Sequence, residues 1–599
     1  MSVSRSVTGD SGVNAQEQGI CAITVPINVC NQLNSSDHDC LVLVTDDVSI
    51  LPAEFELISQ CLSAQNSIVP EFHSGVHLIY CESLPSKRIV LSFTGSLDRD
   101  YDDIRRVSEA ARDGISHALK IGSIRPLLAL TPLKALEKIR VLPSWAKPEA
   151  LCLSTLLGAL HALYVPLEVR EFALRPVKSD LHKSVKPSKV TSLGWFPGTY
   201  TVDHTHLVHI AWCLEEGRRV CRDIGGSDPE RMCASRIVDY IKAELSDTGV
   251  VVKTGPVDAT LYPLAAAVDR GSNERHRGAI VHLEYSGPLA DDPNGSEVTN
   301  LFLIGKGIVY DTGGSDLKVG GIMATMHRDK CGAAAVVGFF KTAALLKPEK
   351  LRLHGSLAIV RNSIGSNAYV SDEIITSRAG LRVRVNNTDA EGRMVMTDLL
   401  CEAKEQALQV VNPHLMTFAT LTGHVVLSYG PNYTGIVANG PSRVMGADQT
   451  FQSYGELLGE MHEISTLRRE DFDAHKAQEE YADLINAARP VGGKRVRGHQ
   501  SPAAFMIVAS GLDSHMTNAE KPLPYTHFDI AGSQGPCPGI PTAVPLLTLA
   551  SRYLLQGFWE VVSKLYKWWE VSIIDSMTSV FSTDPSLPYN HNLFESLIV

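Results

Sequence analysis

Two short segments of this chain carry more charge than soluble proteins usually place beside buried strands. One lies near residue 310, and the other, Asn-Thr-Asp-Ala-Glu-Gly-Arg, spans residues 387–393. Both follow apolar runs typical of buried strands. Buried charges need compensation, and a pair of divalent cations would provide it. The segments together hold four carboxylates, two lysines and an arginine: Asp311, Asp329, Asp389, Glu391, Lys306, Lys318 and Arg393.

These residue types favour metal-dependent hydrolysis. Carboxylate oxygens suit zinc, manganese or magnesium in a two-metal site, where bound water becomes a nucleophile. Lys306 could be a ligand only as a neutral amine, and two neighbouring cations would lower its pKa in that direction. Lys318 and Arg393 would stay charged and face the substrate, with Lys318 placed to stabilise an oxyanion. Taken singly, each residue would more often be a surface or salt-bridge residue, so the prediction depends on the whole set.

The length and the hydrophobic pattern predict an α/β protein with two domains. A chain of 599 residues exceeds one compact domain. Residues 20–174 alternate short β-type runs with helical patterns, which predicts a smaller N-terminal α/β domain. Residues 175–199 predict an exposed linker or, alternatively, a basic anion-binding patch. Residues 200–555 predict a larger catalytic α/β domain with a mostly parallel central sheet flanked by helices.

The two ends of the chain differ from the middle. Residues 1–19 are polar, lack the apolar core of a signal peptide and predict a flexible N-terminus. The tail, residues 556–599, places Phe and Trp at helical spacing from Phe558 to Trp569, which predicts an amphipathic helix. This helix could pack on its own protein or bind a membrane surface or partner.

Composition narrows the possible partners and compartment. The net charge of −11 disfavours nucleic acid as the main partner. No run of eighteen apolar residues indicates a transmembrane segment. The twelve cysteines include no Cys-x-x-Cys pair, which is typical of reduced thiols, so we expect a cytoplasmic protein.

Longer blocks of sequence resemble the leucyl aminopeptidase family, peptidase family M17. The resemblance covers about residues 200–555, and residues 309–312 and 362–365 are most similar to an animal branch of aminopeptidase-like proteins. The block at 387–393 has the form of the family signature. The other matching blocks are 305–314, Lys318, 328–335, 419–423 and 527–532.

The resemblance implies a two-domain subunit that assembles as a hexamer of two stacked trimers and binds two zinc or manganese ions. Lys318 and Arg393 would be the catalytic residues, with the arginine holding a bicarbonate that serves as general base. One metal site would use Lys306, Asp311, Asp329 and Glu391, and the other Asp311, Asp389 and Glu391.

The resemblance also implies the substrate. The enzyme would hydrolyse the N-terminal peptide bond of peptides, with Leu-type apolar residues favoured, by a water that the two metals activate. The free α-amino group of the peptide would bind a metal. The substrate-binding residues would be Met326, Asn387, Thr420, Leu421 and Gly423.

Several positions depart from the family pattern. Asp316 stands where the family has a small or hydroxyl residue, and the segments 222–227, 319–322 and 536–541 are also altered. Because of these changes, a catalytically impaired family member acting as an oligomeric binding or structural protein is an alternative. A DNA-binding regulator has local support only from Lys494, Arg495 and Arg497, and the negative net charge opposes it.

Overall fold

The computed structural model describes residues 25–49, 51–68, 72–174, 186–290, 298–489 and 496–559. Several predicted features fall outside these ranges. They are the polar N-terminus at 1–19, the first part of the linker at 175–185, the basic residues Lys494 and Arg495, and the tail after Trp559.

The N-terminal domain contains a sheet of six strands, of which five run parallel and the edge strand β3 is antiparallel. The β-type runs 40–45, 76–80 and 88–93 predict three of these strands with the bounds that the structure shows. The strands at 40–45 and 88–93 are rich in β-branched and aliphatic residues and almost fully buried, whereas the edge strand at 76–80 is largely exposed. In sheet order the strands are β1 (Ile27–Val29), β6 (Leu193–Phe196), β5 (Pro126–Leu130), β2 (Cys40–Thr45), β4 (Arg88–Phe93) and β3 (Val76–Tyr80).

The C-terminal domain contains a sheet of eight strands with a parallel centre. Strands β17, β13, β9 and β10 run parallel, and antiparallel strands flank them. The order is β15 (His462–Thr466), β14 (Thr434–Ala438), β17 (Tyr525–Asp529), β13 (Pro413–Ala419), β9 (Thr299–Asp311), β10 (Leu351–Asn362), β8 (Ala279–Ser286) and β7 (Val251–Pro256). A third, small sheet joins β11 (Ile374–Thr376), β12 (Arg382–Arg384) and β16 (Leu484–Ile485).

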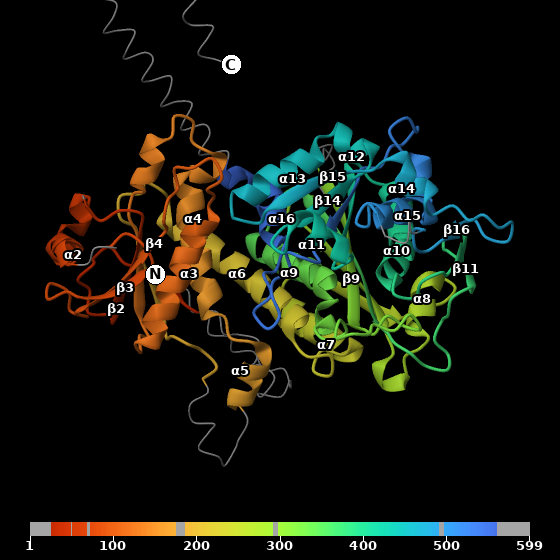
Figure 1. The fold of residues 1–599 in the computed structure, drawn as a ribbon, viewed down its shortest axis with the longest axis horizontal. Coiled ribbons are helices and arrows are strands. Elements are labelled where there is room, and N and C mark those ends of the chain that lie inside the picture. The colour runs from red at the N-terminus through yellow and green to blue at the C-terminus, as the bar shows by residue number, and fades with distance from the viewer. Residues whose placement is uncertain are drawn as a thin grey trace, which may run out of the picture.

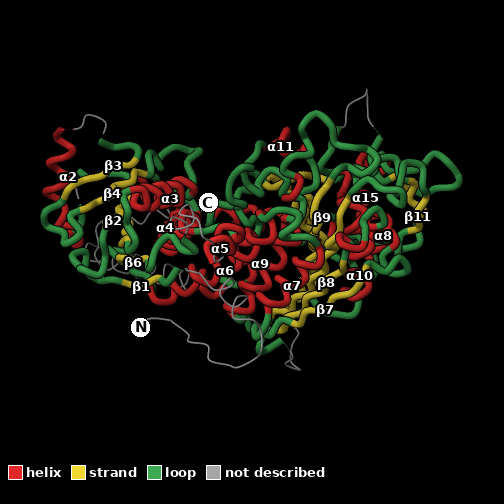
Figure 2. The backbone as a smooth tube through the Cα atoms, turned by 90° about the horizontal axis from the view of Figure 1, so that it is seen from below, coloured by secondary structure: helices red, strands yellow, loops and turns green. Residues whose placement is uncertain are grey.

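Helices cover both faces of the large sheet, as Figures 1 and 2 show. One face packs against α6 (His204–Gly226), α7 (Ala234–Leu245) and α9 (Cys331–Leu346). The other packs against α8 (Pro263–Asp269), α10 (Glu391–Ala407) and α15 (Ser501–Ala509). The predicted fold class is therefore confirmed. The other α-helices of the described residues are α2 (Glu56–Ile68), α3 (Arg105–Lys120), α4 (Pro148–Leu163), α5 (Leu167–Leu174), α11 (Gly423–Tyr429), α12 (Gly440–Val444), α13 (Ala447–Glu456), α14 (Arg469–Asp473) and α16 (Leu546–Tyr553).

Helix α6 joins the two domains and runs between them in Figure 1. Its first half, including Leu207 and Leu214, is buried in the core of the N-terminal domain. Its second half, including Val220 and Ile224, is buried in the core beside the large sheet. One continuous helix thus contributes to both cores, which fixes their relative position.

The sequence pattern predicts two separate strand runs, 301–304 and 307–310, and a helix over 394–408, and the structure corrects both local predictions. The runs 301–304 and 307–310 belong to a single strand, β9, because Gly305 and Lys306 continue its pairing with β10. Helix α10 begins at Glu391 rather than at 394, since a carboxylate in the first helical turn is favoured by the helix dipole.

Strand β6 extends the N-terminal domain beyond the predicted boundary. Strand β6 lies within the range predicted as linker, yet it pairs with β1 and β5 of the N-terminal sheet. We therefore propose that the N-terminal domain ends after β6 and not at residue 174.

At the other end, the described start of the tail packs on its own protein. Trp559 is buried in the N-terminal core, and Phe558 packs against the same cluster. This agrees with the self-packing alternative for these two residues.

Two further properties concern the described residues only. No single helix there is long and apolar enough to cross a membrane. Helices α4 and α5 reach that length and composition only as a pair, with a bend of 49° between them. The cysteines in these ranges are free thiols.

The altered segment at 222–227 contributes to a buried ionic network between α5, α6 and α7. Asp223 is fully buried and accepts hydrogen bonds from Tyr164 (2.9 Å) and Tyr240 (2.5 Å). It also forms ion pairs with Arg170 and Arg219. Removing one member of such a network leaves buried charge poorly compensated.

We predict that Asp223→Asn destabilises the protein by about 3 kcal/mol, because the amide keeps the shape but not the charge. A lower thermal unfolding midpoint would be measured by calorimetry. The matched control is Glu284→Gln, which breaks an exposed pair with Lys253 on the edge strands. Equal effects of the two substitutions would contradict the prediction.

Candidate metal centre

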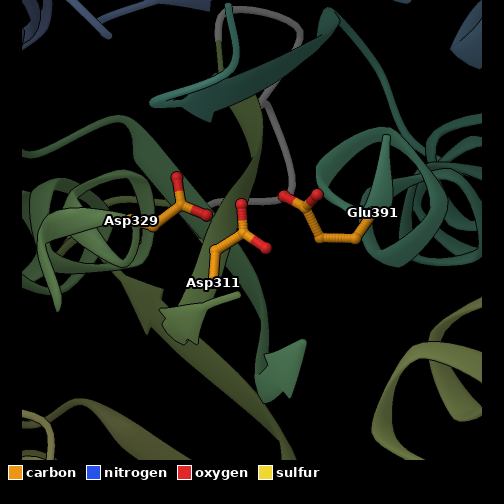
Figure 3. A group of neighbouring side chains, drawn as sticks. All are labelled: Asp311, Asp329 and Glu391. Carbon is orange, nitrogen blue, oxygen red and sulfur yellow. The ribbon is translucent and has the colours of Figure 1, made fainter. Parts of the chain in front are cut away.

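Three buried carboxylates converge at the carboxyl ends of the central strands. Asp311 is the last residue of β9, Asp329 lies two residues before α9, and Glu391 is the first residue of α10. Their carboxylate groups point toward a common space in Figure 3. One oxygen from each lies within 4.8 Å of the others. The parallel topology therefore brings together residues that are far apart in sequence.

The donor set fits a metal ion. Asp329 Oδ2 and Glu391 Oε2 are buried and have no hydrogen-bond partner. Buried acceptor atoms without partners are costly, so a group that binds them is expected. The carboxylates are also the ligand type that hard divalent cations prefer.

Lys306 lies within this cluster, at the middle of β9. Its Nζ is 2.8 Å from Asp329 Oδ1 and 2.8 Å from Glu391 Oε1, and it donates to the carbonyl of Thr420 at 3.0 Å. Burial lowers the pKa of Lys306, but the charges of Asp329, Glu391 and Asp311 outweigh it and hold the pKa above its ordinary value. Lys306 is therefore an ammonium ion paired with the carboxylates when only protein charges are considered.

Lys318 contacts the cluster from the other side. Its Nζ lies 2.9 Å from Asp311 Oδ2 and also pairs with Asp389 Oδ1. Asp389 is thus tied to the three converging carboxylates through Lys318. The side chain of Asp389 is 27% exposed, whereas that of Asp311 is 3% exposed.

The acids are hard to ionise together. Burial and the neighbouring Asp311 charge together raise the pKa of Glu391 to about 8, although the charge of Lys306 opposes them. Burial likewise raises the pKa of Asp329 to about 6, although Lys306 opposes this. Bound cations would favour the ionised forms of all these carboxylates.

Two glycines allow the close approach on which this cluster depends. A Cβ at Gly392 would lie 2.6 Å from Lys306 Cε and 2.8 Å from Leu421 Cδ1. A Cβ at Gly332, in the first turn of α9, would lie 2.0 Å from the carbonyl oxygen of Phe418. Larger residues at either position would push the helix away from β9 and β13.

The cluster opens into a cavity of about 350 Å³. Of the predicted substrate-binding residues, Met326, Thr420, Leu421 and Gly423 line it, as does Arg393. Asn387 is not one of the described residues that line this cavity. Its side chain instead accepts a hydrogen bond from the amide of Asp389 at 2.9 Å. The site predicted as one set is therefore brought together, with Asn387 positioning the signature loop.

Three further residues hold the site and were not predicted. Asn362 Nδ2 donates to Asp311 Oδ1 (2.8 Å) and to the carbonyl of Thr388 (3.0 Å). Tyr369 donates to the same carbonyl at 2.6 Å. Asn486 binds the backbone of Asn387, and Arg393 donates to the carbonyl of Asn486. Asn362 could have been found, because it ends β10 directly opposite Asp311, whereas no sequence signal indicated Asn486.

Asp316, the residue that departs from the family pattern, joins the two loops that carry Lys318 and Asp389. Its Oδ2 accepts from the amide of Thr388 at 2.7 Å, and its own amide donates to Thr388 Oγ1 at 2.8 Å. The added carboxylate therefore links the loops and lies on the outer side of the cluster.

The fold and the site together define a two-domain α/β protein with a candidate acidic metal centre. A family model described as "Cytosol aminopeptidase family, catalytic domain" matches residues 219–548. The chain belongs to this family.

Individual relatives agree with that assignment. The chain is 40% identical over 530 residues to "Putative aminopeptidase" of Caenorhabditis elegans. This match covers 86% of this chain and 95% of the relative. The chain is 31% identical over 269 residues to "Probable cytosol aminopeptidase" of Aquifex aeolicus. This match covers 44% of this chain and 48% of the relative. The match thus spans about half the length of this bacterial relative.

Two solved structures share the fold at 19% identity. A mutant of tomato leucine aminopeptidase superposes with a TM-score of 0.70 and covers 89% of this chain and 97% of its own. The bottromycin maturation enzyme BotP, in complex with Mn, superposes with a TM-score of 0.63. The superposition covers 87% of this chain and 99% of the BotP chain. These likenesses concern the fold alone.

We predict that Asp316→Ala loosens residues 313–318 and 386–391. Loss of the carboxylate removes the acceptor for the Thr388 amide, so amide exchange in both loops should quicken roughly tenfold. Hydrogen–deuterium exchange with mass spectrometry measures this. Ser315→Ala, on the same exposed loop, is the control. Unchanged exchange in Asp316→Ala would contradict the proposed link.

Proposed function

We propose that this chain is a metallo-aminopeptidase that hydrolyses the N-terminal peptide bond of peptides, with Leu-type apolar N-terminal residues favoured. The observation that carries the proposal is the convergence of Asp311, Asp329 and Glu391 with Lys306 and Lys318 beside one cavity. Family membership supports the reaction class, and the apolar residues Met326 and Leu421 in the cavity wall support the substrate preference.

Five residues would hold two divalent ions, zinc or manganese: Lys306, Asp311, Asp329, Asp389 and Glu391. Bound ions would polarise the scissile carbonyl and acidify water in this site. Lys306 would then have cations beside it, which would counter the carboxylate charges that raise its pKa and would favour the neutral amine. The substrate's free α-amino group would bind on the same side, which would restrict cleavage to the first peptide bond.

Lys318 and Arg393 would be the catalytic residues. Lys318 is 12% exposed and faces the cavity, so its ammonium can stabilise negative charge that develops on the carbonyl oxygen. Arg393 lines the same cavity from the first turn of α10 and would hold an anion such as bicarbonate as the general base. Met326, Thr420, Leu421 and Gly423 would contact the substrate, and Asn387 would position Asp389.

We also propose a homo-hexamer, a cytoplasmic location and membership of an animal aminopeptidase-like branch. The names of the bacterial relatives support the location, and the extended match to the nematode protein supports the branch. Nucleic acid is not expected as a partner, given the net charge of −11.

We predict that the purified chain hydrolyses leucine amide only while it carries zinc or manganese, so that removal of the metal with a chelator abolishes turnover and re-addition restores it. Lys318→Ala should lower kcat by roughly 100- to 1000-fold, because one stabilising charge on the oxyanion is lost. Lys253→Ala, an exposed lysine on β7, is the control. A folded, metal-loaded chain without turnover would instead favour an impaired family member that acts as a binding or structural protein.

We predict that light scattering of the full chain gives six times the mass of one 65.1 kDa chain. A monomer at micromolar concentration would contradict the proposed assembly. Because this measurement does not depend on catalysis, it separates the assembly from the activity.

A further inference from the structure

A histidine lines the cavity beside the proposed substrate pocket. His424 is the second residue of α11 and follows Gly423 directly. The loop before it is fixed by Asp529, whose Oδ2 accepts from Thr422 Oγ1 at 2.6 Å. The same loop carries Thr420, whose hydroxyl donates to Asp329 Oδ1 at 2.7 Å. His424 is therefore held in place relative to the carboxylate cluster by a short, well-bonded loop.

His424 forms a pair with a second histidine behind it. The two Nδ1 atoms of His424 and His499 are 2.9 Å apart, and the ring centroids are 5.1 Å apart. Gly498 makes room for the pair, because a Cβ there would lie 2.8 Å from both Cβ and Cγ of His424. His499 is 1% exposed, so only His424 of the pair reaches the cavity.

The hydrogen bonds behind the pair determine its protons. Ser465 Oγ accepts from Gln500 Nε2 (2.9 Å) and from the Tyr429 hydroxyl (3.3 Å). Both of its lone pairs are then used, so its single proton goes to His499 Nε2 at 2.8 Å. His499 must carry its own proton on Nδ1 and donate it to His424 Nδ1.

It follows that His424 carries its proton on Nε2. Within the described residues, the hydrogen-bond contacts of its ring, to His499 and to Ser428 at 3.3 Å, both use Nδ1. Nε2–H is therefore available as a donor on a ring that lines the cavity. Burial lowers the pKa of His424 and lowers that of His499 to about 4, which favours the neutral rings that this chain of hydrogen bonds requires.

We propose that His424 is a substrate-binding residue that donates its Nε2–H to an oxygen acceptor on the bound peptide. The identity of the ligand rests on the proposed function. The acceptor is either a carbonyl on the side chain of the N-terminal residue or the main-chain carboxylate beyond the scissile bond. His499 is a positioning residue, since it acts through the tautomer of His424.

The substrates that separate these two sources are matched in shape. Asparagine amide and leucine amide differ mainly in the side-chain acceptor. Leucyl-glycine and leucine amide differ in the carboxylate beyond the scissile bond. The ratio of kcat/KM within each pair cancels differences in the amount of active enzyme, so a variant that is only partly folded does not disturb it.

His424→Phe keeps the ring and removes the donor. We expect it to lower one of the two ratios by about 3- to 10-fold for a carbonyl acceptor, or about 10- to 100-fold for a carboxylate. His424→Gln retains an N–H donor and should restore part of the ratio. His499→Phe should shift the ratio in the same direction but less, because His424 can then adopt either tautomer. His73→Phe, on the exposed surface of the N-terminal domain, is the control.

Both ratios unchanged in His424→Phe would overturn this proposal while leaving the aminopeptidase assignment intact. Wild-type protein that turns over none of the three compounds would overturn the aminopeptidase assignment instead. In that case, calorimetry with the same uncleaved compounds decides on His424. Tighter binding of an acceptor-bearing compound that His424→Phe abolishes supports the proposal, and equal binding by both proteins contradicts it.

Discussion

Mutual repulsion among Asp311, Asp329 and Glu391 is the constraint around which the catalytic domain is arranged. Buried carboxylate oxygens within 4.8 Å of one another cannot all be ionised without positive charge nearby. Lys306 and Lys318 provide two positive charges against four carboxylates when Asp389 is included. The remaining deficit is what divalent cations would neutralise.

The surroundings of the cluster follow from this requirement. Gly332 and Gly392 let α9 and α10 approach β9 and β13, so that Asp329 and Glu391 reach the same point as Asp311. Asn362 fixes Asp311 from the neighbouring strand. On the side of the cavity, hydrogen bonds between loops hold the site. Asp316 binds Thr388, and Asn486 binds the backbone of Asn387. The site is thus rigid at its base and open on the side of the cavity.

Much of the fold could be predicted from the sequence. Continuous apolar runs such as those of β2 and α9 must be buried on all sides, and in an α/β protein such runs form central strands or the helices that pack on the sheet. The prediction divided β9 at Gly305 and Lys306, since a lysine inside a buried strand contradicts the pattern unless carboxylates surround it. The site residues 306–329 and 387–393 could be identified through motif spacing. Asn486, His424 and His499 could not, because their roles depend on contacts between segments that are distant in sequence and that show no local pattern.

The central claim is that the carboxylate cluster holds two divalent ions. Metal analysis by mass spectrometry on protein purified without chelators, alongside Asp329→Asn, tests it most directly. We expect close to two zinc or manganese ions per chain in the wild type and a clear loss in the variant, which removes one ligand without changing the volume of the side chain. Fewer than one ion per chain in well-folded wild-type protein, even after incubation with zinc or manganese, would contradict the account.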